Sequence, residues 1–243
     1  IGVFSTDQIA AISTGVVRGL SSVQLRGLNS DQVAALTTDQ AKALVSSQLG
    51  SLTTDALAGF ETEDVAQLTS AQVIGFGSRE LVALGTEGFA AISAGAVKGL
   101  SSGAIRGLGS DQVAALTTAQ AVALTSLQVA SISTGAIAGL ETEDIAALSS
   151  AQVASMGSVQ VRLLGSDQVG AISSDAIVGV SSVQLRSIST EALAGLTTEQ
   201  VVVLKSAQVA GLVSSQIGVL GTDQIAAIST GVVRGLNSVQ LRG

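Results

Sequence analysis

The residues best placed to do chemistry are two short groups of carboxylates, carried by the related segments ETEDVAQL and ETEDIAAL. The two groups consist of Glu61, Glu63 and Asp64, and of Glu141, Glu143 and Asp144. Neighbouring carboxylates can act as a general acid and base or can bind Ca²⁺. Their spacing matches neither an EF-hand loop nor a glycine-rich calcium repeat. We therefore expect solvated carboxylates at helix N-termini, where the helix dipole favours negative charge.

Serine and threonine hydroxyls are abundant, but the chain contains no histidine or cysteine that could form a nucleophilic site with them. A Ser–Lys pair would need Lys42, Lys98 or Lys205, and none of these stands in a distinctive sequence. No phosphate-binding or dinucleotide-binding glycine motif occurs. Helix capping accounts for the hydroxyls. We predict a protein that is not an enzyme, with no catalytic, cofactor-binding or metal-binding residues and no cofactor.

All of these residues belong to an eight-residue repeat, the octad, which runs from Ser5 to the end of the chain without a slip. Thirty octads follow one another, the last lacking one residue. Positions five and eight are apolar and hold all four phenylalanines and Met156. Position two is Ser or Thr in all octads but one, and position four is Gln in eighteen. Acidic residues favour position three, basic residues favour position six, and position seven is small in all but four octads.

A longer repeat overlies the octads, since residues 217–243 match residues 1–27 at all but three positions. The array has therefore grown by duplication of blocks as well as of single octads. We predict that residues 1–243 are one continuous tandem array. Because Ile1 stands in mid-repeat, we expect it to be a segment of a longer protein.

The octad period excludes a single long helix and a flat strand. Eight residues advance an α-helix by about 80° beyond two turns, so the apolar positions would spiral around it. Positions five and eight have opposite parity, so a strand would point them to opposite faces. One short helix per octad is unstable alone and must stack on others. We predict an all-α solenoid of very short helices with positions five and eight in its core; the alternative is a β-solenoid with Ser/Thr pairs at its corners.

Capping signals give the expected helix start. With position one as the N-cap, a Gln at position four is N3 and completes a capping box. Val45, Lys205 and Val213 occupy position one in three octads, so position two is the alternative cap. The Gln could instead form a ladder along the solenoid. The small residue at position seven could permit a left-handed helix exit, but the frequency of Ala there favours close approach of neighbouring backbones.

Composition narrows the possible partners. The net charge is −7 and the eleven basic residues are scattered, which argues against nucleic acid. No apolar run approaches the roughly eighteen residues of a membrane span, and the absence of cysteine excludes disulfides and thiolate metal sites.

The segments LTTDQAKAL, LTTAQAVAL and LGSDQVAAL resemble the L-[ST]-[ST]-x-Q-V-A-A-L repeats of very large, adhesin-like bacterial surface proteins. The resemblance extends over the whole chain and implies an extracellular or cell-surface location. It gives no support for haem binding, because the chain has no His, Cys or Tyr.

Three functional hypotheses follow. The unbroken array and its low charge favour a structural protein that forms a fibre by stacking and self-association. The alternative is an adhesin stalk or binding scaffold that presents other domains or contacts an unknown surface or host ligand. Ice binding would need a flat β-face with Thr ladders, and Ser and Thr are freely mixed here. An enzyme is the least favoured, since no nucleophile and base can be paired.

Overall fold

The computed structural model describes residues 1–240 and is helical throughout, with 28 α-helices, one 3₁₀ helix and no strand among these residues. The predicted all-α class is confirmed, and the β-solenoid alternative is wrong. The chain divides into two compact units, Ile1–Leu124 and Thr125–Gly243. No helix within residues 1–240 is both long enough and apolar enough to cross a membrane.

The helices contain four to seven residues each, and there is one in nearly every octad. The helices of the first unit are α1 (Thr6–Ala10), α2 (Thr14–Gly19), α3 (Ser22–Leu25), α4 (Ser30–Ala34), α5 (Thr38–Ala43), α6 (Ser46–Leu49), α7 (Thr54–Leu57), α8 (Thr62–Ala66), α9 (Ser70–Val73), α10 (Ser78–Ala83), α11 (Gly85–Ala91), α12 (Ala94–Val97), α13 (Ser102–Arg106), α14 (Ser110–Ala114) and α15 (Thr118–Ala123). Those of the second unit are α16 (Ser126–Ser131), the 3₁₀ helix η1 (Ile137–Gly139), α17 (Thr142–Ala147), α18 (Ser150–Ser155), α19 (Ser158–Arg162), α20 (Ser166–Ala171), α21 (Ser174–Ile177), α22 (Ser182–Ser187), α23 (Thr190–Leu193), α24 (Thr198–Val203), α25 (Ser206–Val209), α26 (Ser214–Ile217), α27 (Thr222–Ala227) and α28 (Thr230–Val233).

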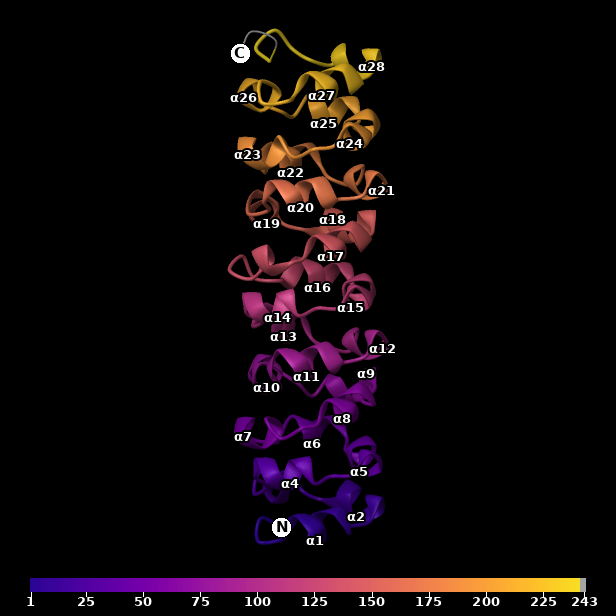
Figure 1. Ribbon diagram of the computed structural model, residues 1–243, viewed down its shortest axis with the longest axis vertical. Helices are drawn as coiled ribbons and strands as arrows, with labels where there is room; N and C mark the ends of the chain where they lie inside the picture. The colour runs from indigo at the N-terminus through magenta and orange to yellow at the C-terminus, as the bar shows by residue number, and fades with distance from the viewer. Residues whose placement is uncertain (241–243) are drawn as a thin grey trace. The chain divides into compact units, whose positions relative to one another are not determined.

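Helices three octads apart pack against each other, so each unit is a three-sided solenoid. In the first unit α1 contacts α4, α4 contacts α7 and α7 contacts α10, and two parallel columns begin at α2 and α3. The second unit has the same arrangement, with columns that begin at α16, α17 and α19. Within each unit, successive layers follow the colour of the chain in Figure 1. One turn of the solenoid is therefore three octads, or 24 residues.

The helices begin where the capping signals predict. Position one is the N-cap of every described α-helix except α11, and its backbone is extended. The hydroxyl of Thr37 accepts a hydrogen bond from the backbone N–H of Gln40, while the Gln40 amide oxygen accepts one from the backbone N–H of Thr37. At Val45, which has no side-chain acceptor, the reciprocal bond to Gln48 remains at 2.9 Å. The prediction of an N-cap at position one is confirmed. Where position one has no side-chain acceptor, the Gln side chain at position four still accepts a hydrogen bond from the backbone N–H of position one.

Positions five and eight form the core, as predicted. Every position-five side chain from Ile9 to Val209 is buried, as is every position-eight side chain from Leu28 to Leu212. The four-residue helices cannot hold their shape alone. Between these limits each turn of three octads buries six apolar side chains, and each Val, Leu, Ile, Phe or Met among them contributes about 1.5–3 kcal/mol through removal from water. Stability therefore resides in the stacking of turns rather than in the single helix.

Small residues at position seven allow the backbones of stacked octads to meet. A Cβ built on Gly59 would overlap the carbonyl oxygen of Ser30 in the turn below, and Gly75 and Gly99 stand in the same relation to Ser46 and Ser70. No position-seven glycine has a positive φ; Gly85 at position one is the only described residue that does. Close backbone approach, rather than a left-handed helix exit, explains the small residues.

Substitution of Gly59 by Ala is expected to destabilise the chain by about 1–3 kcal/mol, because the added methyl group meets a backbone oxygen that cannot rotate away. Gly19 is the matched control: it is also at position seven, but a Cβ there meets nothing within 4 Å. Gly19→Ala should raise stability by about 0.5–1 kcal/mol through helix propensity. Urea unfolding followed by circular dichroism measures both, and equal effects would contradict the close-approach explanation.

Candidate interaction surface

The side chain of Gln at position four clamps one turn of the solenoid to the next. The Gln40 side-chain nitrogen donates to the backbone carbonyls of Ile9 and Ile12, at 2.8 and 2.6 Å. Gln200 makes the same bonds to Val169 and Ile172. The partners lie 28–31 residues earlier in the chain. These amides thus combine the capping role with a contact between turns, and they bind backbone rather than one another.

The two carboxylate groups are not uniformly solvated, which corrects the prediction from sequence. Their glutamates are exposed, but Asp64 is only 4% exposed and Asp144 only 2%. Both aspartates occupy position four, the position at which Gln is buried in other octads. Within the octad, the only signal of this burial is the position that the two aspartates share with the buried glutamines. Among residues 1–240 no group of three His, Cys, Asp or Glu side chains could hold a metal ion.

Replacing Asp64 with Gln is expected to stabilise the chain by about 1 kcal/mol, the usual net value of an intramolecular hydrogen bond. The new amide would stand at the position from which other glutamines donate to carbonyls 28 and 31 residues earlier, here those of Leu36 and Val33. Glu63→Gln, at an exposed position of the same helix, serves as the control and should change stability little. The midpoint of thermal unfolding distinguishes them; a lower midpoint for Asp64→Gln would show that Asp64 is required as a carboxylate.

The three lysines considered as partners for serine all lie at the surface. Lys42 and Lys98 are exposed, and the Lys205 ammonium donates to the backbone carbonyl of Val178 at 3.3 Å. Met156 is buried in the core. The solvent-facing side of most helices is formed by the residues at positions three and six, which are three residues apart and lie on the same helix face.

One carboxylate at position three has a perturbed pKa. The backbone N–H of Glu199 and then the hydroxyl of Thr197 hold the pKa of Glu199 below its ordinary value, with burial opposing and Thr198 contributing less. Glu199 is at the N-terminus of α24, where donor groups are unpaired by the helix itself. It therefore carries its negative charge throughout the neutral range.

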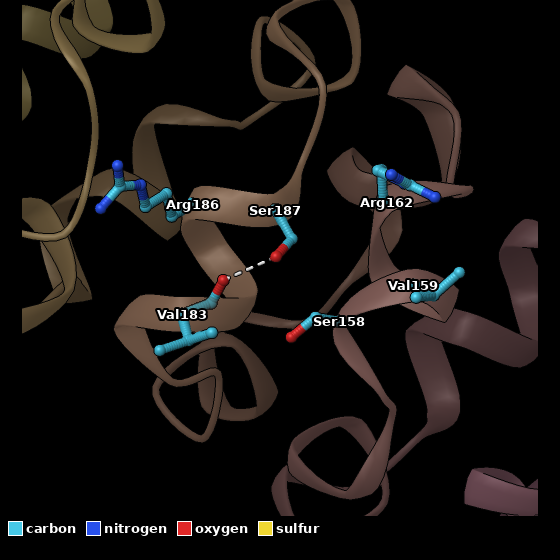
Figure 2. A pocket seen from close by; sticks show the side chains of 6 residues that line it. All are labelled: Ser158, Val159, Arg162, Val183, Arg186 and Ser187. Carbon is cyan, nitrogen blue, oxygen red and sulfur yellow. Dashed lines mark hydrogen bonds between the residues drawn. The ribbon is translucent and has the colours of Figure 1, made fainter.

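A shallow groove of about 400 Å³ lies between α19 and α22. Its lining residues are Ser158, Val159, Arg162, Val183, Arg186 and Ser187. Figure 2 shows the two serines facing the space between the helices, with one arginine on either side. The Ser187 hydroxyl donates to the carbonyl of Val183 at 2.8 Å. Neither guanidinium forms an ion pair or hydrogen bond within residues 1–240.

Sequence analysis did not single out this groove. The signal that could have found it is the pair of octads GSVQVRLL and SSVQLRSI, which stand three octads apart. Each has Val at position three and Arg at position six. Their significance depends on knowing that octads three apart are neighbours, and only the fold supplies that spacing.

A family model for the ALTTAQ repeat matches residues 9–46, 89–126, 137–174 and 201–230, which together are more than half of the chain. The chain belongs to the ALTTAQ repeat family. Each matched segment begins at position five of an octad, so the ALTTAQ repeat and the octad are in phase. Residues 115–120 read ALTTAQ unchanged, and the final residue, Gln120, clamps its turn to the one before. A comparison with curated proteins finds no match.

Proposed function

We propose that this ALTTAQ repeat chain is an extracellular structural protein that forms a fibre by stacking of its turns and by self-association. The observation that carries the proposal is the uniformity of the turn. The same apolar positions, the same cap and the same glutamine clamp recur along both units. An array built in this way gains length with each added octad without a change in cross-section.

Exposed apolar side chains support self-association. Positions three and six carry branched apolar residues whose exposed fraction is about half or more, among them Val23, Ile74, Leu127, Val183 and Val202. Single exposed apolar residues are ordinary on protein surfaces, and it is their recurrence at the same octad positions that we take as support. Here the octad frame repeats them along the array, which suits contact between copies.

The surface location rests on the resemblance to repeats of very large bacterial surface proteins. The same resemblance supports the second candidate, an adhesin stalk that holds other domains away from the cell. A stalk would share the uniform turn but would not need contacts between copies. A measurement of self-association therefore distinguishes the fibre from the stalk.

The test is negative-stain electron microscopy of the purified 243-residue chain together with far-ultraviolet circular dichroism. Filaments or lateral bundles with a helical spectrum are expected. Monodisperse particles at every concentration and salt tried would overturn the fibre and favour the stalk. A β-type spectrum would contradict the fold as well.

A further inference from the structure

We infer that the groove between α19 and α22 is a lateral contact site that binds the acidic position-three residues of a second copy of this chain. The inference rests on the proposed self-association and names the surfaces that carry it. Three observations support it: the groove has two arginines without partners among residues 1–240, exposed carboxylates stand at the same spacing, and acidic and basic residues occupy different octads.

The groove offers two cations that have no ion-pair or hydrogen-bond partner among residues 1–240. Arg162 and Arg186 are exposed, and Val159 and Val183 beside them are also exposed. Arginine with exposed apolar neighbours is typical of protein interfaces, because the planar guanidinium binds carboxylates in two-point fashion. The groove is therefore suited to carboxylates presented on an otherwise low-charge surface.

The same chain presents carboxylates with the matching spacing. Asp175, Glu199 and Asp223 are exposed at position three of α21, α24 and α27, and consecutive members of this column pack against each other. Each step is three octads, as is the step from Arg162 to Arg186. Because both pairs follow the same helix stacking, two side-by-side copies can align two arginines with two carboxylates at once.

Acidic residues at position three and basic residues at position six mostly occur in different octads, so most of them cannot pair within one helix. Nine octads have a basic residue at position six, and eight of them have Gly or Val rather than an acid at position three. An acid there would stand three residues before the base, a spacing at which helical side chains pair. These octads therefore lack an ion pair between positions three and six. Because the net charge is −7, carboxylates outnumber the basic residues and can bind the exposed arginines of another copy.

The experiment uses charge reversal of each surface in the 243-residue chain. R162E/R186E makes the groove acidic, and D175K/E199K makes the column of α21 and α24 basic. Either variant alone brings like charges together and is expected to raise the critical concentration for assembly by roughly tenfold or more. An equimolar mixture of the two restores both complementary contacts and should assemble as the unaltered chain does. High salt should weaken assembly of the unaltered chain, since the Debye length falls to about 3 Å at 1 M.

The matched control is K98E/R106E, which makes the same change in net charge at exposed position-six residues outside the groove. Sedimentation velocity measures assembly, and circular dichroism checks that each variant keeps its fold. If the unaltered chain assembles and R162E/R186E behaves as the control does, or the mixture fails to recover, the groove assignment is wrong while self-association stands. If the unaltered chain does not assemble at all, both proposals fail.

Discussion

Replacing Leu57 with Asp is expected to lower the free energy of unfolding by at least about 4–5 kcal/mol, the upper range for single substitutions. Leu57 is fully buried at position five of α7. The change removes an apolar side chain, at a cost of about 2–5 kcal/mol in a core of this kind. It also places a carboxylate among apolar side chains, where an unpaired charge is strongly disfavoured.

The loss of local stability caused by Leu57→Asp should extend from α7 to the helices of the two adjacent turns and stop there. α7 packs against α4 and α10, and a solenoid octad has contacts only with its own and adjacent turns. Hydrogen exchange should show lost protection in α4, α7 and α10 and near-native protection in α13. Thermal unfolding followed by circular dichroism gives the overall change.

Asp55→Asn is the control for Leu57→Asp, because Asp55 is exposed at position three of the same helix. It should change stability by no more than about 0.5 kcal/mol. Comparable losses from both substitutions would mean that position five is not the core.

Replacing Gln120 with Glu is expected to cost about 3–5 kcal/mol at neutral pH, although the two side chains are nearly the same size. The Gln120 amide nitrogen lies 3.0, 3.2 and 2.6 Å from the carbonyl oxygens of Phe89, Ala90 and Ile92. A carboxylate there would face three acceptors with no hydrogen to donate. The capping bond from the Thr117 N–H, at 2.9 Å, needs only the oxygen and would remain.

The pH dependence of the Gln120→Glu variant identifies the cause. Facing carbonyls and burial both disfavour the charged form, so the pKa of the introduced Glu is raised in the folded state. The folded state then binds more protons than the unfolded state, and stability falls as the pH rises above the ordinary pKa of Glu. Unfolding midpoints at about pH 4 and pH 7 should therefore differ more for the variant than for the parent chain.

Gln8→Glu is the control for Gln120→Glu. Gln8 accepts the same capping bond from the Ser5 N–H, but its side chain is exposed. This substitution should be nearly neutral at both pH values. A large loss at Gln8 would assign the cost to the cap rather than to the contact between turns.

Local chemistry made several features predictable from the sequence. The octad frame, the all-α class, the N-cap at position one and the apolar character of positions five and eight can all be recognised within a single octad. Even the small position seven was predicted as a close approach, because Ala resists the left-handed conformation that a glycine cap would need.

Other features depend on residues 24 to 31 apart in the chain, and only the tertiary structure decided them. Three octads complete a turn because helices three octads apart pack on one another, and no single octad encodes that closure. The same closure brings the amide of Gln120 to the carbonyls of the turn before it and buries Asp64, which the octad alone presents as a solvated helix start. It also places Arg162 and Arg186 along one groove, because helices separated by two others along the chain become neighbours only when the turn is complete.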